Sequence, residues 1–348
     1  MAEPPLRGRG AGSNPPNRYE RMHLELDDPD GGDEPTVYYR DASRSVLAEN
    51  DSPDVAFRYS LNPYRGCEHG CAYCYARPTH EYLGFSAGLD FERRIMVKED
   101  APALLRTTLS SPRWVPQVVA LSGNTDCYQP VERRLGITRR CLEVFVEFRN
   151  PVGVVTKSAL VTRDADLLGE LARHGAAHVS CSVTTLDPEL ARRLEPRAPQ
   201  PAKRVDAIAT LAAAGVPVSV LVGPVIPGLN DSEIPRILAE AKAAGARSAS
   251  WVLLRLPKPV DALFLRWLEE HVPDRKSRVL HRIQDTRAGR LSDTTFGRRK
   301  RGQGVYAGQI AALFEAAARK HGLDRPLPPP NTAAFRRPPA AGEQLGLL

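Results

Sequence analysis

The sequence has no long hydrophobic run and few cysteines, and each shortage excludes a class of protein. No stretch approaches the roughly 18 uninterrupted apolar residues that a membrane-spanning helix needs. The first residues, MAEPPLRGRGAGSNPPNR, lack the apolar segment of a secretory signal. Six cysteines in 348 residues are too few for a disulfide scaffold. We therefore expect a cytoplasmic protein with no membrane partner.

The bulk composition is that of an ordinary globular protein. With 42% hydrophobic and 26% charged residues, the chain can bury one large core or two modest ones. The net charge of +7 attracts polyanions. The same modest excess is also common in proteins that bind none, so the charge alone leaves nucleic-acid binding open.

Both ends of the chain are rich in small residues and proline and offer little to bury. The first 35 residues combine proline, glycine and acidic runs, which cannot offset the entropy of ordering. The last residues repeat this composition with proline and alanine. We predict a mostly disordered tail over residues 1–50, a folded core over 51–260, a helical extension over 261–325 and a disordered tail over 326–348.

The predicted core alternates strictly between strands and helices. Short apolar runs occur at residues 115–123, 152–158, 177–185, 217–226 and 248–256, and helical patterns lie between them at 138–149, 164–175, 201–216 and 231–246. Gly175, Gly215 and Gly245 each stand where a helix should stop. This alternation predicts an α/β fold of parallel strands with right-handed crossovers, best matched by a full or partial (β/α) barrel. An open doubly wound sheet is the alternative, and in both folds the chemistry belongs at the C-terminal ends of the strands.

One segment, NPYRGCEHGCAYCYARP (62–78), spaces Cys67, Cys71 and Cys74 as C-x3-C-x2-C. Such a tight loop directs three thiolates at three corners of an iron–sulfur cubane, and the fourth iron has either a distant protein ligand or an exogenous one. The amino-acid part of S-adenosylmethionine (SAM) suits the exogenous position. A zinc loop is the alternative, but zinc sites typically add a second Cys or His pair, which only His69 and His80 could supply.

With its aromatic residue before the third cysteine, this loop resembles the signature of the radical SAM superfamily. Three further segments resemble the branch that contains spore photoproduct lyase and proteins labelled DNA repair photolyases: LSGNTDCYQPVERRLGITRR (121–140), VVTKSALVTRDADLL (154–168) and CSVTTLDPELARRLEPRAPQPAKRVDAI (181–208). The resemblance implies an enzyme with a [4Fe–4S] cluster that cleaves SAM reductively to a 5′-deoxyadenosyl radical. It also implies an electron donor such as a flavodoxin or ferredoxin.

The same resemblance assigns residues to SAM. Lys157 and Ser182, at the ends of two predicted strands, would hold the SAM carboxylate and ribose region, and Asp126 would contact the amino group. A solvated lysine and a hydroxyl satisfied within the sheet are the plainer interpretations of the first two.

Two further positions are assigned less specifically. Glu195 would reach the ribose or pair with Arg197, as an ordinary salt bridge does. Tyr73 or Tyr75 would pack on the adenine, although a core tyrosine is also typical at such a place.

In spore photoproduct lyase, a cysteine in the loop after the second strand returns a hydrogen atom to the product radical. The corresponding residue here is Gly123, and Cys127 stands four residues later. We predict Cys127 as a hydrogen donor if the loop is shaped differently; otherwise it is a small buried residue, as we expect of Cys141 and Cys181.

Two features near the C-terminus indicate nucleic-acid metabolism. The basic loop over residues 287–301 could track the phosphates of DNA or RNA, although a solvated charge run has the same composition. Its cations are Arg287, Arg290, Arg298, Arg299, Lys300 and Arg301, with Phe296 as the single aromatic residue. The final residues, QLGLL (344–348), resemble the peptide with which proteins of DNA metabolism bind the bacterial sliding clamp.

These observations support three hypotheses. The first is a cytoplasmic radical SAM enzyme whose substrate is unknown and includes nucleic acid as a candidate, with lyase-like repair chemistry as in spore photoproduct lyase. The second is a zinc-dependent nucleic-acid-binding module without catalysis. The third is an electron-transfer iron–sulfur protein, which would not need Lys157 to face SAM.

Overall fold

The computed structural model describes residues 8–338, apart from residues 12, 16, 18–34 and 56. The clamp-like peptide at 344–348 lies outside these residues, so that expectation stays a prediction.

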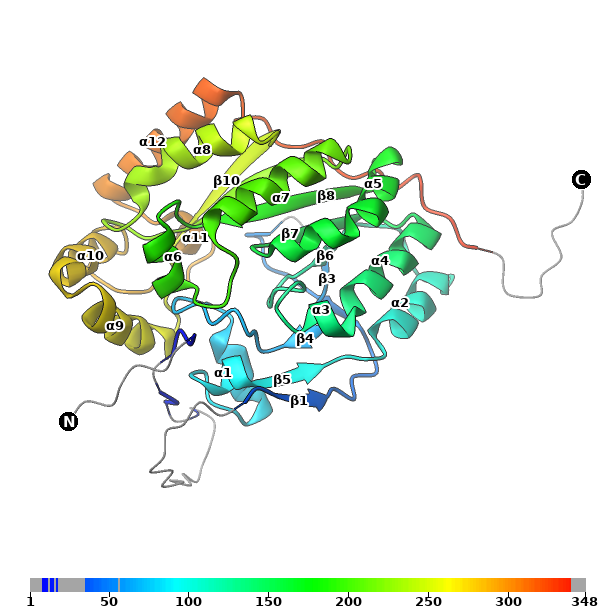
Figure 1. The fold of residues 1–348 in the computed structure, drawn as a ribbon, viewed down its shortest axis with the longest axis horizontal. Coiled ribbons are helices and arrows are strands. Elements are labelled where there is room, and N and C mark those ends of the chain that lie inside the picture. Colours follow the sequence, from blue (N-terminus) through cyan, green and yellow to red (C-terminus); the bar gives the residue numbers. More distant parts are fainter. Residues whose placement is uncertain (1–7, 12, 16, 18–34, 56, 339–348) are drawn as a thin grey trace, which may run out of the picture.

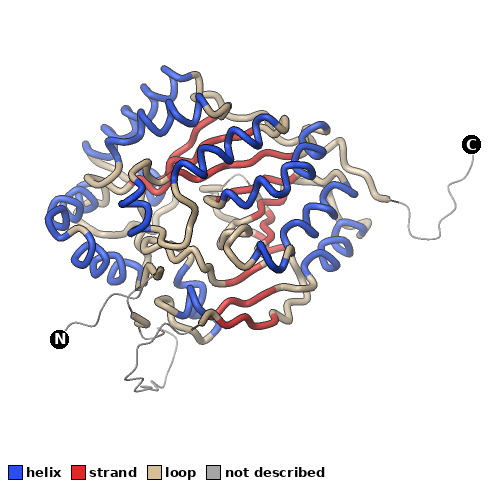
Figure 2. Tube along the Cα trace, in the orientation of Figure 1, coloured by secondary structure: helices blue, strands red, loops and turns tan. Residues whose placement is uncertain are grey.

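A seven-stranded sheet forms the centre of the molecule, in the order β10-β9-β8-β7-β6-β3-β2 (Figures 1 and 2). Its strands are β2 (Leu47–Glu49), β3 (Tyr59–Leu61), β6 (Val119–Leu121), β7 (Val152–Thr156), β8 (Ala177–Val183), β9 (Val218–Val225) and β10 (Ser248–Leu253). All pairings from β3 to β10 are parallel, and β2 adds an antiparallel edge. Because the strand order follows the sequence and never reverses, the fold is the predicted partial (β/α) barrel and not the doubly wound sheet.

Helices between the strands cover the outer face of this sheet (Figure 1). They are α2 (Ala101–Ser110), α4 (Ile137–Phe148), α5 (Ala165–Arg173), α7 (Pro201–Ala213) and α8 (Ile234–Ala243), with the short helices α3 (Glu132–Leu135), η2 (Ala159–Asp164), α6 (Pro188–Leu194) and η3 (Asp231–Glu233) in the connections. The three glycines predicted to end helices all have positive φ, between 67° and 98°.

The main core lies between sheet and helices. Val154 and Val179, paired across β7 and β8, are fully buried. They share one apolar cluster with Leu142 of α4 and Leu171 of α5. The sheet is therefore held by burial of its β-branched side chains under helices with one apolar face.

A second, smaller sheet carries the cysteine loop. It pairs β1 (Val37–Arg40) with β5 (Arg94–Val97) in parallel, and β5 with β4 (Tyr64–Arg65) antiparallel. The loop follows β4 directly and is continued by η1 (Arg77–Leu83) and α1 (Asp90–Arg93).

The prediction of a mostly disordered tail over residues 1–50 is wrong for the described part. Strands β1 and β2 lie within it, and the backbone amides of Gly10 and Ala11 donate to the carboxylate of Glu92 at 3.1 and 2.9 Å. The partners of these residues are far away in sequence, so local composition did not indicate them.

The C-terminal extension is helical, as predicted. It contains α9 (Val260–His271), α10 (Pro273–Asp285), α11 (Arg298–Arg301) and α12 (Val305–His321). Among the described residues, no helix has the length and apolar character needed to cross a membrane.

The segment after α12 packs on the body, which corrects the prediction of disorder for its described part, residues 326–338. The Asn331 amide donates to the carbonyl of Gly175 at 2.8 Å, and the Arg336 amide to that of Phe148 at 2.9 Å. The ring of Phe335 lies 6.3 Å from that of Phe148. The segment thus satisfies carbonyl groups at or just after the ends of α5 and α4.

We expect Phe335→Ala to lower the free energy of unfolding by about 1 kcal/mol, because a half-buried ring loses its contact with Phe148. Urea unfolding followed by circular dichroism measures the change. The control is Val115→Ala, at a side chain that is 69% exposed; it should change stability by less than about 0.5 kcal/mol. An equal, small effect of both variants would show that the segment does not pack in solution.

Candidate functional site

A buried ion pair fixes the backbone of the cysteine loop. Arg77, fully buried, pairs with Glu92 at 2.5 Å and donates to the carbonyl of Cys71 at 2.9 Å and to that of Gly88 at 2.8 Å. Because a buried charge is stable only when its partners are complete, these contacts fix the position of the Cys71 peptide.

A second set of hydrogen bonds joins the loop to the segment after β6. The Gln129 side chain accepts from the Glu68 amide at 2.9 Å and donates to the Gly66 carbonyl at 3.2 Å. The carboxylate of Glu68 in turn accepts from the Val131 amide at 2.6 Å. The loop is therefore held from both flanks.

The three loop cysteines form a donor set suited to an iron–sulfur cluster. All are free thiols; Cys67 and Cys71 are buried and Cys74 is partly open. Burial raises the pKa of Cys67 well above its ordinary value, and the nearby charges of Cys71 and Cys74 raise it further. Neighbouring thiols that are poorly solvated lose their protons only when a positive charge stabilises the thiolates. The iron of a bound cluster would supply that charge. Within the described part of the chain, no three His, Cys, Asp or Glu side chains converge as ligands of one metal ion.

A buried carboxylate joins the cysteine loop to two strand ends. Glu195, 1% exposed, accepts from the Thr184 hydroxyl at 2.7 Å and lies 3.3 Å from the Lys157 ammonium. The Tyr73 hydroxyl donates to the same carboxylate, and Arg204 pairs with its other oxygen. We call these five residues the Glu195 network.

The Glu195 network is charged. Burial alone would raise the pKa of Glu195, but the neighbouring charges of Arg204 and Lys157 lower it well below its usual range. Burial would likewise lower the pKa of Lys157, whereas negative charge on its neighbours, including Glu195, raises it well above its ordinary value. The ammonium and the carboxylate thus keep each other ionised out of water.

The structure brings together three of the residues that the sequence assigned to SAM: Tyr73, Lys157 and Glu195. Asp126 lies beside them, where its carboxylate accepts from the Lys157 amide at 3.0 Å and the Thr156 hydroxyl at 2.7 Å. Its role here is to position the backbone that carries Lys157. The contacts of these residues with SAM stay predictions.

The structure corrects one alternative for a neighbouring residue. Glu195 and Arg197 do not pair, because Arg197 pairs with Glu68 at 3.2 Å and Glu195 with Arg204 and Lys157. The Ser182 hydroxyl donates to the carbonyl of Gly223 at 3.0 Å, as in the plainer alternative for that residue, and its contact with SAM stays a prediction.

The structure does not support Cys127 as a hydrogen donor. Its side chain is fully buried in the main core, together with Cys141. Burial also raises the pKa of this thiol well above its ordinary value. An apolar core is the normal place for a free cysteine, and the loop shape that would have exposed it is not present.

Sequence reasoning missed three residues that build the site. Thr184 and Arg204 complete the Glu195 network, and Gln129 holds the cysteine loop. Thr184 had a signal, since it lies at the C-terminal end of the same predicted strand, 177–185, that contains Ser182. Arg204 had none, because its partner Glu195 lies outside the helix that carries Arg204.

The basic loop over 287–301 is more internally bonded than its composition indicated. Arg287, 2% exposed, donates to the carbonyls of Leu254 at 2.6 Å and Arg298 at 3.0 Å. Arg299 pairs with Asp54, in the connection between β2 and β3. The loop is thereby fixed beside the end of β10.

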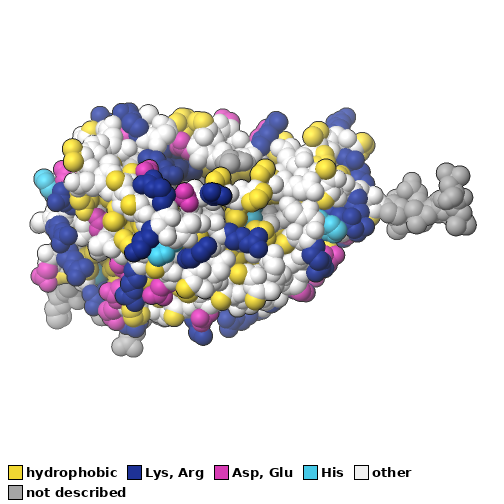
Figure 3. All heavy atoms as spheres, turned by 90° about the horizontal axis from the view of Figure 1, so that it is seen from above, with side chains coloured by type: hydrophobic (Ala, Val, Ile, Leu, Met, Phe, Trp, Pro, Cys, Tyr) yellow, Lys and Arg dark blue, Asp and Glu magenta, His cyan; other side chains and the backbone are white. Residues whose placement is uncertain are grey.

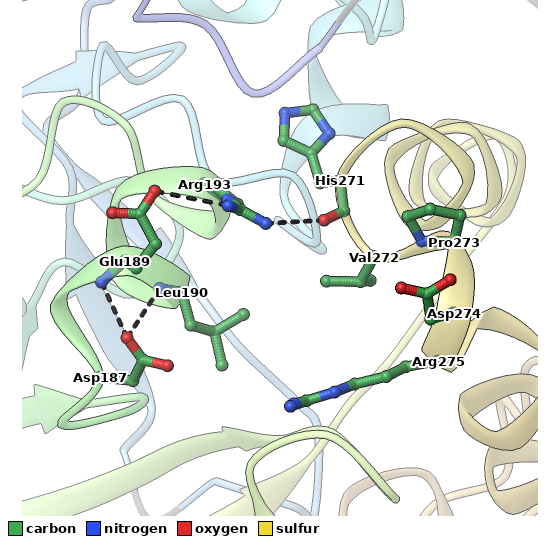
Figure 4. A pocket seen from close by; sticks show the side chains of 9 residues that line it. All are labelled: Asp187, Glu189, Leu190, Arg193, His271, Val272, Pro273, Asp274 and Arg275. Atoms are coloured by element: carbon green, nitrogen blue, oxygen red, sulfur yellow. Dashed lines mark hydrogen bonds and ion pairs between the residues drawn. The ribbon is translucent and has the colours of Figure 1, made fainter.

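A surface pocket of about 230 Å³ lies between the start of α6 and the turn from α9 to α10 (Figure 4). Arg193 lies on its wall, bonded to Glu189 and to the His271 carbonyl, and Arg275 extends across from the other side. None of the predicted site residues lines this pocket.

We expect Glu195→Gln to destabilise the cluster-free protein by about 3–5 kcal/mol, because Arg204 and Lys157 lose the charge that compensates theirs. Urea unfolding under anaerobic conditions measures it. Glu189→Gln, in the adjacent helix and 53% exposed, removes the same charge from a surface pair and should cost less than about 1 kcal/mol. Similar costs for both variants would contradict a buried, charged network.

Comparison with known proteins identifies the family. A family model for the radical SAM superfamily matches residues 61–241. An uncharacterized protein of Mycobacterium tuberculosis is 39% identical over 236 residues, which cover 66% of this chain and 69% of that protein. A radical SAM Nalpha-GlyT isomerase of Pseudomonas phage M6 is 28% identical over 209 residues, 60% of this chain and 41% of the isomerase.

The fold is similar to that of spore photoproduct lyase complexed with dinucleoside spore photoproduct. The TM-score is 0.57 at 16% identity, over 82% of this chain and 78% of the lyase. With its cysteine loop beside the strand ends of a partial barrel and a family match over that whole region, the chain belongs to the radical SAM superfamily, whose enzymes use a [4Fe–4S] cluster and SAM.

Proposed function

We propose that this radical SAM enzyme acts on nucleic acid. The observation that carries the proposal is the position of the basic loop 287–301, which is bonded to the end of β10 on the side where the cysteine loop meets the strand ends. Tyr75, next to Cys74, is 45% exposed there and donates to the Gly123 carbonyl at 3.2 Å. Cations beside an exposed aromatic ring suit a phosphate backbone with accessible bases.

The proposed roles of the residues follow from their contacts. Cys67, Cys71 and Cys74 would ligate the cluster, whose fourth iron stays open for SAM. Cluster and SAM together supply the 5′-deoxyadenosyl radical that removes a hydrogen atom from substrate. Lys157, 15% exposed at its side chain, would neutralise the SAM carboxylate while Glu195 holds its ammonium in place.

A lyase reaction in DNA repair is the finer proposal that the branch suggests, and its hydrogen-return step differs here. A side chain at Gly123 would have its Cβ 2.7 Å from the Cβ of Ser60, so the loop leaves no space for a thiol at that position. The product radical is therefore expected to regain hydrogen from another donor, which points to a reaction other than that of spore photoproduct lyase itself.

The proposed setting is the reducing cytoplasm, where free thiols and a cluster persist. A flavodoxin or ferredoxin would supply the electron, and the peptide 344–348 would contact the sliding clamp.

The test is anaerobic reconstitution with iron and sulfide, followed by dithionite, SAM and an assay for 5′-deoxyadenosine with and without single-stranded DNA. Wild type should form 5′-deoxyadenosine, and DNA should increase its yield. Cys71→Ala should abolish it, because the cluster loses a ligand. Cys141→Ala, which removes another buried thiol, in α4, should retain iron and product.

Each part of the proposal has its own contrary outcome. Colourless protein with one zinc in wild type and Cys141→Ala would contradict the assignment of the cluster and favour a zinc module. A 5′-deoxyadenosine yield that is indifferent to DNA and RNA, with no altered nucleoside after digestion, would contradict the substrate class.

A further inference from the structure

A half-buried arginine that forms no hydrogen bond and no ion pair with the described residues lies just after β10. Among the described residues, the guanidinium of Arg255 has neither a carboxylate partner nor a hydrogen bond. It rests on the ring of Tyr75, 5.3 Å from the ring centroid. Its donors are therefore available at the same end of the barrel as Cys74, where Tyr75 is exposed.

Two further cations lie nearby on α11. Arg299 pairs with the carboxylate of Asp54, and the Lys300 ammonium donates to the Asp54 carbonyl at 2.6 Å. The Gly297 amide also donates to this carboxylate, at 2.6 Å. The Asp54 carboxylate is thus already occupied by the Gly297 amide and by Arg299, and Lys300 contacts only the backbone carbonyl of Asp54.

These like charges work against one another. Burial lowers the pKa of Arg255 and the charge of Arg299 lowers it further, while Tyr75 and Asp54 oppose the change. Burial also lowers the pKa of Lys300, where Asp54 opposes the change and Arg255 and Arg299 add to it. A bound anion would relieve this repulsion.

The arrangement is fixed by the fold. Arg287 donates to the carbonyls of Leu254, Arg298 and Arg299, so one buried side chain ties the residue before Arg255 to the helix that carries the other two cations. A solvated charge run would not be anchored in this way.

Aromatic surface accompanies the cations. Phe296 is 53% exposed, and the guanidinium of Arg299 lies 4.3 Å from its ring centroid. Exposed rings next to arginines are the usual platform for unpaired bases. Figure 3 shows Lys and Arg side chains spread widely over one face of the molecule, so a specific site has to be distinguished from diffuse charge.

We propose that Arg255, Arg299 and Lys300 form a phosphate-binding subsite that holds a phosphodiester of single-stranded nucleic acid while the adjoining nucleoside lies beside Tyr75. This inference rests on the proposed function and names the contact that selects its substrate. A salt-bridged loop would account for Arg299 and Lys300, and stacking on Tyr75 for the position of Arg255, but neither uses the hydrogen-bond donors of the Arg255 guanidinium.

The test is binding of a fluorescein-labelled ten-nucleotide thymidine oligonucleotide to the reconstituted full chain, measured by anisotropy at several salt concentrations. Arg255→Gln should weaken binding about tenfold and reduce the slope of log Kd against log salt by about one. Arg255→Lys keeps the charge and should lose less. Lys203→Gln, at an exposed lysine of α7, removes the same charge elsewhere and should bind within about twofold of wild type.

Thermal unfolding of each variant confirms that it is folded. Competition against the labelled oligonucleotide identifies the form of the phosphate that is bound. Unlabelled oligonucleotide should compete far better than thymidine monophosphate or inorganic phosphate, and equal competition by the monophosphate would overturn the assignment to nucleic acid. Equal weakening by Arg255→Gln and Lys203→Gln, or none by either, would overturn the subsite. Oligonucleotide binding needs no turnover. A wild type that forms no 5′-deoxyadenosine would therefore contradict the proposed function but leave the evidence for the phosphate-binding subsite unchanged.

Discussion

The site depends on one buried carboxylate, Glu195. Its two oxygens accept hydrogen bonds from a tyrosine of the cysteine loop and a threonine after β8, and form ion pairs with a lysine at the end of β7 and an arginine of α7. Each of these groups would be costly to bury alone, and together they compensate one another. The strand ends and the cysteine loop therefore keep a fixed distance without any contribution from a ligand.

The features of the fold that could be predicted are those that depend on residues close together in the sequence. Apolar runs and glycine stops located the parallel strands and their helices, since burial on both faces leaves a continuous hydrophobic signature. The spacing of Cys67, Cys71 and Cys74 predicted the loop, because three ligands on one short turn are a local property. Strands β1 and β2 escaped prediction, because their stability comes from pairing with β5 and β3.

Outside the cysteine loop, the site was predictable where a residue adjoins a strand end, as Lys157 does, or lies in a segment that resembles the family, as Glu195 does. Their partners Thr184 and Arg204 were not predicted, because pairing across the barrel has no sequence period. Cys127 illustrates the converse: only three residues lie between it and Gly123, yet its thiol is buried in the main core. Composition likewise does not distinguish two arginines with different surroundings: the buried Arg287 of the basic loop donates to backbone carbonyls, whereas Arg255, just after β10, contacts the ring of Tyr75.

The cysteine loop has partners on both sides of it in the chain, and this has a consequence for protein synthesis. Its Glu92 partner binds Gly10 and Ala11 upstream, and Tyr73 needs Glu195, 122 residues downstream. When the three cysteines leave the ribosome, Glu195 and Arg204 have not yet been synthesised. The contacts that these two residues make to the site are therefore still missing. Iron delivery to the assembled loop must then follow translation through α7, so a stalled or truncated chain would expose thiols with no finished place for the metal.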